Sequence, residues 1–259
     1  IGQPTFYGDH SCRNALRERG VPEKELSRWA ANSCMGLVVE GCEVSNMWGG
    51  VVNFLLPLEL ALNQGKPFHK HLPIPLETEP LGTVLSFTPL KDKFLEYLAE
   101  IAGFCIRASS ICTENIRRER PNPYVSALLN HCIERGKDRL DGGADYYITI
   151  IEGFGLVNAA DTLHTIRTLV FEQQRYRIQD LIEGAEDNFQ GHDALLREIR
   201  ALPKYGNGQE DVDELVADLA ARFQNIVRSH STADTCFAPS FHTLNQHITA
   251  GSKFGASLD

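Results

Sequence analysis

The chain has 259 residues, of which 42% are hydrophobic and 23% charged, with a formal net charge of −9. These proportions are typical of a soluble globular protein with a sizeable core, arranged as one large domain or two smaller ones. The acidic balance argues against nucleic acid or an anionic membrane as a partner, because both select for clustered Lys and Arg.

The first half of the chain is predicted to contain helices joined by a glycine-rich loop. An amphipathic helix begins at Pro22, a favourable first helical position, and ends near Asn32. Residues 33–47 have no helical period and read as a loop with close backbone turns. Residues 51–62 are almost entirely apolar and predict a buried helix. A long helix is expected over 90–120, where two prolines then end it.

The second half alternates predicted helices with two strands. Residues 145–151 are rich in β-branched and aromatic side chains, as strands are. A second strand is expected over 241–248, as a neighbour of the first. The helices expected around them cover 125–135, 156–174, 178–188, 193–201 and 211–230. Many helices around a few buried strands predict an α/β fold.

The cysteines indicate a reducing compartment. There are seven, an odd number, and none forms a C-x-x-C pair or a cluster with zinc-type spacing. We therefore expect free thiols, no metal site and a cytoplasmic location. No run approaches the roughly 20 apolar residues that span a bilayer.

Several short segments resemble, in order and spacing, those of the glycyl radical enzyme superfamily, which includes pyruvate formate-lyase and the glycerol and choline lyases. The segments are N-S-C-M-G at 32–36 with the run at 53–64, G-F-G-L-V-N-A-A-D-T-L at 153–163, D-N-F-Q-G at 187–191, P-K-Y-G-N-G at 203–208 and G-A-S-L-D at 255–259. The resemblance covers nearly the whole chain.

The resemblance implies a fold and a set of partners. It implies part of a ten-stranded barrel of two antiparallel five-stranded halves surrounded by helices, with a cysteine loop entering the barrel. Residues 1–259 would be one pyruvate formate-lyase-like domain, the second half of that barrel. The chain ends where family members continue into the glycine radical segment, so we expect an incomplete catalytic core, inactive alone, that binds no cofactor itself. The implied partners are a radical S-adenosylmethionine activating enzyme that installs the glycine radical, the remaining polypeptide, a small-molecule substrate and a second copy in a homodimer.

Cys34 is the residue that the resemblance marks as the thiyl radical, which abstracts hydrogen from the substrate. We expect it on a tight loop directed at the midpoints of the two predicted strands. Small neighbours such as Ser33 and Gly36 would allow close approach of the substrate, whereas most free cysteines are inert core residues. Cys42 is the rival candidate, but it lies too near the following helix for this role.

Gly36 is the main departure from the family pattern. Eliminating members carry Glu at this position, two residues after the radical cysteine, as the base for the substrate hydroxyl. Cys34-Met35 instead resembles the benzylsuccinate and alkylsuccinate synthases, although residues 41–50 contain no Arg to hold fumarate. The sequence therefore favours carbon–carbon bond formation or cleavage on a hydrocarbon or aryl substrate. The alternatives are a diol dehydratase or other C–O or C–N lyase, and a non-catalytic fragment or scaffold subunit.

The other candidate residues would surround Cys34. Glu40 and Glu43 are the acids near the loop, and either could be a general base if burial raised its pKa, or simply a solvated loop acid. The predicted substrate contacts form a largely apolar pocket. They are Met35, Asn46, Trp48, Ile151, Phe154 and His247, each of which could instead be a packing residue.

Overall fold

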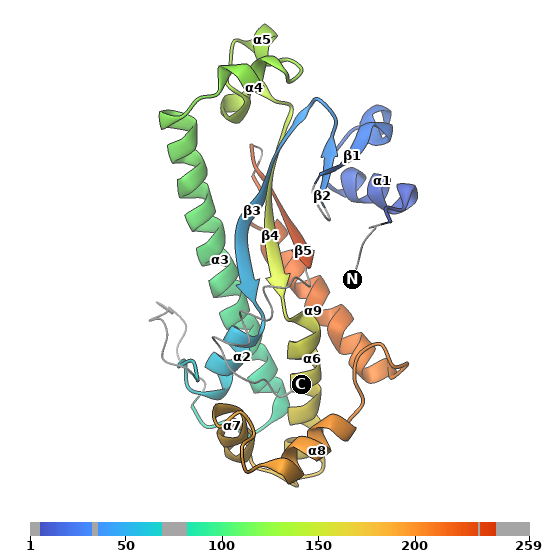
Figure 1. Cartoon of the computed structure of the whole chain (residues 1–259), viewed down its shortest axis with the longest axis vertical. Coiled ribbons are helices and arrows are strands. Elements are labelled where there is room, and N and C mark those ends of the chain that lie inside the picture. Colours follow the sequence, from blue (N-terminus) through green and yellow to red (C-terminus); the bar gives the residue numbers. More distant parts are fainter. Residues whose placement is uncertain (1–5, 33–35, 69–81, 233, 242–259) are drawn as a thin grey trace. The chain divides into compact units, whose positions relative to one another are not determined.

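The computed structural model describes residues 6–32, 36–68, 82–232 and 234–241 (Figure 1). It has an α/β fold in which the described residues fall into two compact units. The first unit is drawn from Ile1–Gly50, Cys105–Glu152 and Val227–Ser240, and the second from Val51–Phe104, Gly153–Ile226 and Phe241–Asp259. Several elements therefore begin in one unit and continue into the other.

The elements alternate helices with five described strands. The strands are β1 (Trp29–Asn32), β2 (Gly36–Val39), β3 (Glu43–Asn53), β4 (Tyr146–Phe154) and β5 (Cys236–Phe241). The α-helices are α1 (Asp9–Glu18), α2 (Leu55–Leu62), α3 (Phe87–Glu119), α4 (Pro123–Ala127), α5 (Cys132–Arg135), α6 (Leu156–Ile166), α7 (Ile178–Glu186), α8 (Asp193–Ala201) and α9 (Glu210–Arg228). Shorter helical segments are η1 (Glu23–Arg28), η2 (Arg139–Gly143) and η3 (Arg167–Glu172).

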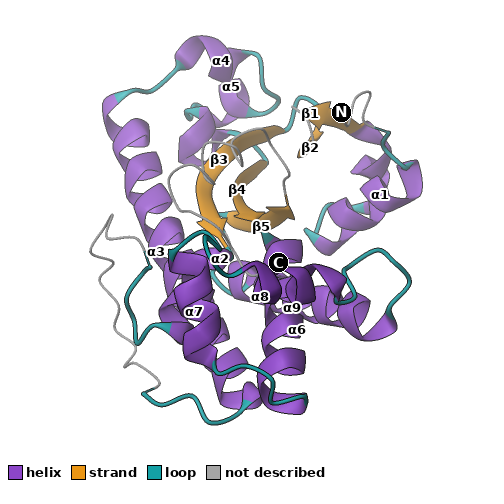
Figure 2. Cartoon of the chain, turned by 60° about the horizontal axis from the view of Figure 1, so that its bottom comes forward, coloured by secondary structure: helices purple, strands orange, loops and turns teal. Residues whose placement is uncertain are grey.

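The strands form two sheets. β1 and β2 pair antiparallel, with Trp29 opposite Val39 and Asn32 opposite Gly36. The other sheet has the order β3-β4-β5, and its three strands lie side by side in Figure 2. The β3 and β4 arrows point the same way in Figure 1, as expected for strands joined by a long helical crossover. A ten-stranded barrel would need strands beyond these and stays a prediction.

A glycine in β4 organises the core of the second unit. A Cβ atom on Gly153 would lie 2.8 Å from the Phe54 ring and 3.2 Å from the rings of both Phe223 and Phe241. The Phe54 and Phe223 rings pack edge to face with centroids 5.1 Å apart, and the Phe223 and Phe241 centroids are 5.6 Å apart. Only glycine at this position leaves room for the three rings. The packing places the end of β4 against Phe223 of α9.

The strongly periodic segments fold as predicted. The helix expected over 90–120 is α3, that over 193–201 is α8, and the strand expected over 145–151 is β4. The interval 156–174 is helical but divides into α6 and η3, and 125–135 divides into α4 and α5. At the second break His131 has a positive φ of 67°, which an α-helix cannot accommodate.

The N-terminal prediction was wrong in several places. Helix α1 was not predicted, and the helix expected from Pro22 is only the single 3₁₀ segment η1, which passes directly into β1. The interval 33–47, predicted as a loop, contains β2 and the start of β3. Strand β3 continues to Asn53, so the helix expected from 51 starts four residues late, where the Asn53 Oδ1 atom accepts a hydrogen bond from the Leu55 N–H at 3.0 Å.

The second predicted strand begins earlier than expected. β5 covers Cys236–Phe241 and is the neighbour of β4, so the adjacency of the two strands is correct. The rest of the predicted interval, 242–248, lies outside the described residues. Among the helices that are described, none is long and apolar enough to cross a membrane.

Glu59 in α2 provides a test of the second unit's core. Burial raises the pKa of the Glu59 carboxyl to about 7, although the Phe68 N–H donates to its Oε2 atom at 3.2 Å. A pKa raised in the folded state stabilises the protein fully below the unfolded value, near 4.5, and this contribution is lost as the pH rises through 7.

We therefore expect Glu59→Gln to raise the unfolding free energy at pH 8, by up to about 3 kcal/mol, and to leave it nearly unchanged at pH 4. Urea unfolding of both proteins at pH 4, 6 and 8 measures this difference. Equal pH dependence in the two proteins would contradict the assignment.

Candidate active site

Strand β4 presents alternate side chains to two different layers of the first unit. The Tyr147 hydroxyl lies 3.0 Å from the Thr113 hydroxyl on α3. Ile151 is fully buried on the same side, since a Cβ atom on the adjacent Gly50 would meet both Ile151 Cδ1 and the Cys105 Cβ of α3. Because strand side chains alternate, the odd-numbered residues of β4 in this unit face α3.

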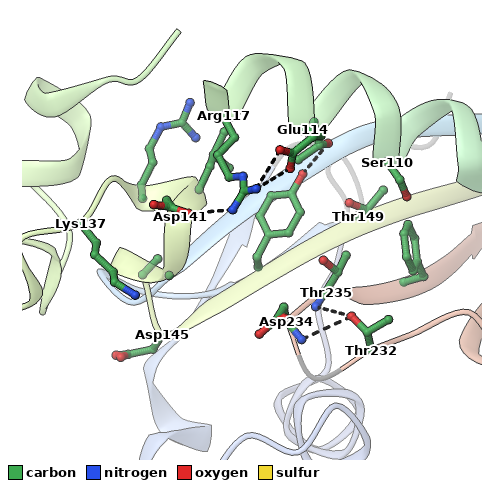
Figure 3. A pocket seen from close by; sticks show the side chains of 17 residues that line it. Ser110, Glu114, Arg117, Lys137, Asp141, Asp145, Thr149, Thr232, Asp234 and Thr235 are labelled. Carbon is green, nitrogen blue, oxygen red and sulfur yellow. Dashed lines mark hydrogen bonds and ion pairs between the residues drawn. The ribbon is translucent and has the colours of Figure 1, made fainter. Parts of the chain in front are cut away.

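A cavity of about 690 Å³ lies on this α3 side (Figure 3). Its walls are polar and include Thr113 and Arg117 of α3 with Tyr147 of β4. The Arg117 guanidinium donates to Asp141 at 2.7 Å and to Glu114 at 2.8 Å, so charges in the cavity are partly satisfied by each other. The described residues predicted as site residues do not line this cavity.

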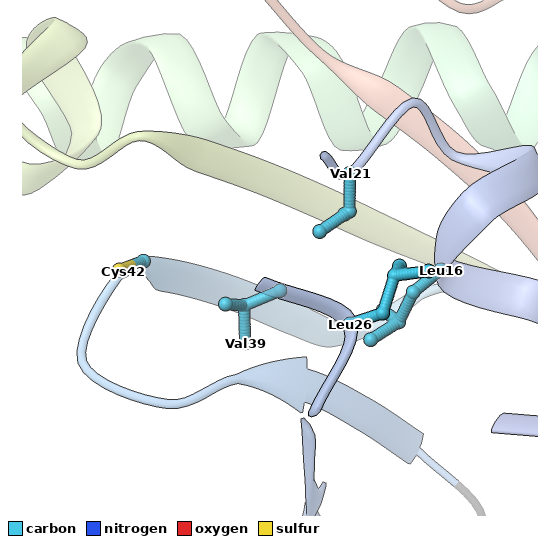
Figure 4. Packing of buried hydrophobic residues seen from close by; sticks show 5 residues of the cluster. All are labelled: Leu16, Val21, Leu26, Val39 and Cys42. Atoms are coloured by element: carbon cyan, nitrogen blue, oxygen red, sulfur yellow. The ribbon is translucent and has the colours of Figure 1, made fainter. Parts of the chain in front are cut away.

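At the start of β4, the other face packs against the N-terminal β1–β2 hairpin. Tyr146 packs, with Trp29, against a buried apolar cluster, and its hydroxyl donates to Glu25 Oε2 at 2.8 Å. The cluster joins α1, η1 and the hairpin (Figure 4): Leu16, Val21, Leu26, Val39 and Cys42. The even-numbered residues of β4 therefore lie on the hairpin side of the sheet.

At the closed end of the hairpin, position 36 has no space for a side chain. Asn32 and Gly36 are its last paired residues, on either side of the 33–35 connection that contains Cys34. A Cβ atom on Gly36 would lie 2.5 Å from the Asn32 carbonyl oxygen and would also overlap the Met47 methyl group of β3. Gly36 is thus required by the packing of the hairpin on β3.

Three predicted site residues, Cys34, Met35 and His247, lie outside the described residues. Their roles stay predictions based on the resemblance.

Glu43, predicted as a possible base, is a buried ion-pair residue. Its carboxylate contacts the Arg19 guanidinium at 2.6 Å and accepts the Val39 N–H at 2.9 Å. Burial raises the pKa of the Glu43 carboxyl above its ordinary value, although Arg19 and the Val39 N–H act in the opposite direction. These contacts tie Glu43 to the Val39 end of β2, about 10 Å along the strand from Gly36.

Glu40, the other predicted base, lies in the exposed turn after β2. Its backbone is fixed to Arg28: the Glu40 N–H donates to the Arg28 carbonyl at 2.9 Å, and the Arg28 guanidinium donates to the Glu40 carbonyl at 2.9 Å. Both predicted acids are therefore at the end of the hairpin opposite Gly36.

The described residues predicted as substrate contacts do not converge. The Asn46 amide donates to the Ser109 hydroxyl of α3 at 3.4 Å, and Ile151 also faces α3. Trp48 is 58% exposed in this chain. Phe154 is partly buried and ends β4 in the second unit.

Glu152 is a buried acid that was not selected from the sequence. It lies in β4 with 1% of its surface exposed, on the same face as Tyr146 by the alternation of the strand. The sequence did offer a signal for this residue: a single charged residue directly follows the six uncharged residues Tyr146–Ile151 of a predicted strand.

Comparison with known proteins decides the family. The family model described as pyruvate formate lyase-like matches residues 1–251. The chain belongs to this family. It is a member of the glycyl radical enzyme superfamily, as the sequence motifs predicted.

Two curated relatives that the chain matches over nearly its whole length have dehydratase names. The chain is 28% identical over 262 residues to a trans-4-hydroxy-L-proline dehydratase of Clostridioides difficile, covering 99% of this chain and 33% of the relative. It is 26% identical over 265 residues to a (2S)-3-sulfopropanediol dehydratase of Klebsiella oxytoca, covering 100% of this chain and 32% of the relative.

A solved structure agrees with these sequence comparisons. The structure concerns 1,2-propanediol dehydration in Roseburia inulinivorans, and it matches with a TM-score of 0.88 and 26% identity. The match covers 100% of this chain and 33% of that chain. The chain therefore spans about one third of the length of the relatives that it matches.

The Arg19–Glu43 pair should be essential to the hairpin. Arg19→Met leaves a buried carboxylate without its cation, which typically costs about 3–5 kcal/mol. Arg19→Met with Glu43→Gln should recover much of this loss, because Gln is neutral and can still accept the Val39 N–H. Urea unfolding of the wild type, the single variant and the double variant measures the recovery, and a double variant no more stable than the single one would contradict the pairing.

Gly36 should not tolerate even a methyl group. Gly36→Ala is expected to lower the unfolding free energy by about 1–3 kcal/mol, through overlap with the Asn32 carbonyl. Adding Met47→Ala should restore only part of this loss, since the Asn32 carbonyl belongs to the backbone. The control is Gly8→Ala, where the nearest atom to a new Cβ would be 3.6 Å away. Thermal unfolding compares the variants, and equal effects at Gly36 and Gly8 would refute the packing argument.

Proposed function

We propose that this chain is part of a glycyl radical enzyme that removes water from a small hydroxylated substrate. The observation that supports this most is the naming of two curated relatives and the subject of one solved structure. Two curated relatives at 26–28% identity are named dehydratases, and a structural relative at 26% identity concerns the dehydration of a diol. Cys34 is the proposed hydrogen-abstracting residue.

This proposal reverses the preference drawn from the sequence. Gly36 had favoured carbon–carbon bond formation or cleavage, because the carboxylate expected of an eliminating enzyme is missing there. The relatives support the elimination alternative instead. Carbon–carbon chemistry on a hydrocarbon or aryl substrate remains the second candidate function, and the absence of a side chain at Gly36 is what favours it.

The proposed enzyme depends on parts outside this chain. We propose that another segment of the polypeptide carries the glycine radical, that a radical S-adenosylmethionine activating enzyme installs it, and that the protein is a cytoplasmic homodimer. When present, the glycine radical would supply the oxidising equivalent that Cys34 uses. Met35, Phe154 and His247 are the proposed substrate contacts.

The test uses the full-length protein that contains this chain, activated under anaerobic conditions. It should dehydrate at least one of propane-1,2-diol, glycerol or trans-4-hydroxy-L-proline, and mass spectrometry would detect a product lighter by one water. Cys34→Ala should abolish the product while the glycine radical signal in electron paramagnetic resonance persists. Cys42→Ala, which removes a thiol from the buried cluster, is the control and should remain active. Product only from a hydrocarbon with fumarate would refute the dehydratase proposal in favour of the second candidate.

A further inference from the structure

Among the described strands, β2 has a partner on one edge only. Its inner edge pairs with β1, and the two strands form a sheet of their own. In an antiparallel pair, every second residue directs its N–H and C=O groups away from the partner strand. In β2 these residues are Leu37 and Val39, because the Val39 carbonyl accepts the Cys42 N–H at 3.1 Å, outside the hairpin ladder. The outer edge of β2 therefore presents polar backbone groups that need partners.

A buried ion pair supplies partners for this outer edge. The Arg19 guanidinium donates to the Leu37 carbonyl at 3.3 Å, and the Glu43 carboxylate accepts the Val39 N–H at 2.9 Å. Arg19 and Glu43 contact each other at 2.6 Å, and their side chains are only 13% and 0% exposed. The two side chains thus lie where a neighbouring strand would lie, one as the donor and the other as the acceptor.

The same ion pair joins the hairpin to the three-stranded sheet. Glu43 is the first residue of β3, and Arg19 also interacts with Cys236, the first residue of β5. Burial raises the pKa of the Cys236 thiol, although the positive charge of Arg19 and its hydrogen bond act in the opposite direction. From the C-terminal end of α1, Arg19 therefore reaches β2, β3 and β5, all within the first unit.

These contacts restrict how the hairpin can move on the sheet. Its closed end lies against Met47 of β3, and the ion pair holds both residues of the outer edge. A hairpin attached at two separate places has a fixed angle on the sheet as well as a fixed position. Asn32 and Gly36 are paired on either side of the connection 33–35, so the two ends of this connection move only with the hairpin.

The angle of the hairpin matters because the connection contains Cys34, the proposed hydrogen-abstracting residue. Transfer of a hydrogen atom needs the two reacting atoms in contact, and a misplacement of about 1 Å can lower the rate about 100-fold. We propose that Arg19 is a positioning residue for hydrogen abstraction, which fixes the cysteine-bearing hairpin on β3 and β5. This inference rests on the proposed function, in which Cys34 generates the substrate radical.

The test measures kcat per glycine radical in the activated full-length protein, using the compound among the three above that the wild type dehydrates fastest. Arg19→Lys keeps a positive charge beside Glu43 but lacks the planar fork that serves several acceptors at once. We expect kcat per radical to fall at least about 10-fold. The dissociation constant of the substrate, measured by calorimetry on the non-activated protein, should change less than about threefold, because Arg19 acts through the hairpin and not on the substrate.

A double variant separates positioning from stability. Arg19→Met with Glu43→Gln leaves no charge unpaired, so its melting temperature should lie closer to that of the wild type than the temperature of Arg19→Met does. Met has no N–H for the Leu37 carbonyl, so kcat per radical should stay at least about 10-fold below the wild type. The matched control is Arg228→Met, which breaks an exposed ion pair with Glu18 at 2.8 Å. Its kcat per radical should remain within about twofold of the wild type.

Two results would overturn the proposal. One is a loss of kcat per radical of less than about 10-fold for Arg19→Lys, whether or not the substrate binds more weakly. The other is a double variant whose turnover recovers together with its melting temperature, because Arg19 would then only stabilise the fold. If only the hydrocarbon with fumarate gives product, the dehydratase proposal fails, and the same comparison on that substrate decides the role of Arg19. A wild type without turnover on any of these substrates refutes both proposals.

Discussion

The two-sided burial of β4 is the constraint on which the described part of the site depends. In the first unit its odd-numbered residues meet α3, while its even-numbered residues meet the β1–β2 hairpin and the apolar cluster beneath it. A strand covered on both faces cannot shift by one residue without exchanging the two sets of side chains. This fixes which side chains share a face with the cysteine-bearing hairpin and which belong to the α3 side.

The same constraint explains how much could be predicted from the sequence. The long helix α3 and the strand β4 are strongly periodic or strongly apolar, and both were located correctly. The hairpin was missed because β1 and β2 are four residues each, and because local sequence does not reveal the close approach of Gly36 to Met47 of β3. Short strands whose partners are distant in sequence carry little propensity signal of their own.

The candidate site shows a similar division. Cys34 was predicted because a motif resembles a known family; the family is shown, and the role of Cys34 stays a prediction. The pocket residues were chosen by type and proximity in sequence, without knowledge of the face that each occupies. Asn46 and Ile151 turn toward α3, whereas Glu152, which differs from Ile151 by one position, turns to the other side. Neighbouring positions in a strand face opposite sides, so a difference of one position decides whether a side chain contacts α3 or lies on the hairpin side.

Gly36 departs from the pattern that the resemblance implies for eliminating enzymes, in a way that packing makes hard to reverse. Restoring a carboxylate there would require moving the Asn32 carbonyl, a backbone atom in the closing pair of the hairpin. A lineage with this geometry must either use different chemistry or obtain its proton transfer from another element.

The connection between β3 and β4 also has a consequence for how the protein is made. β3 ends at Asn53 and its partner β4 begins at Tyr146, so roughly ninety residues separate the two strands in the chain. At ribosomal rates of about 5–20 residues per second, β3 waits on the order of 5–20 s for its partner. During that time its edge can pair with another nascent chain. The yield of folded protein in the cell should therefore depend on chaperones that shield this segment until β4 has been synthesised.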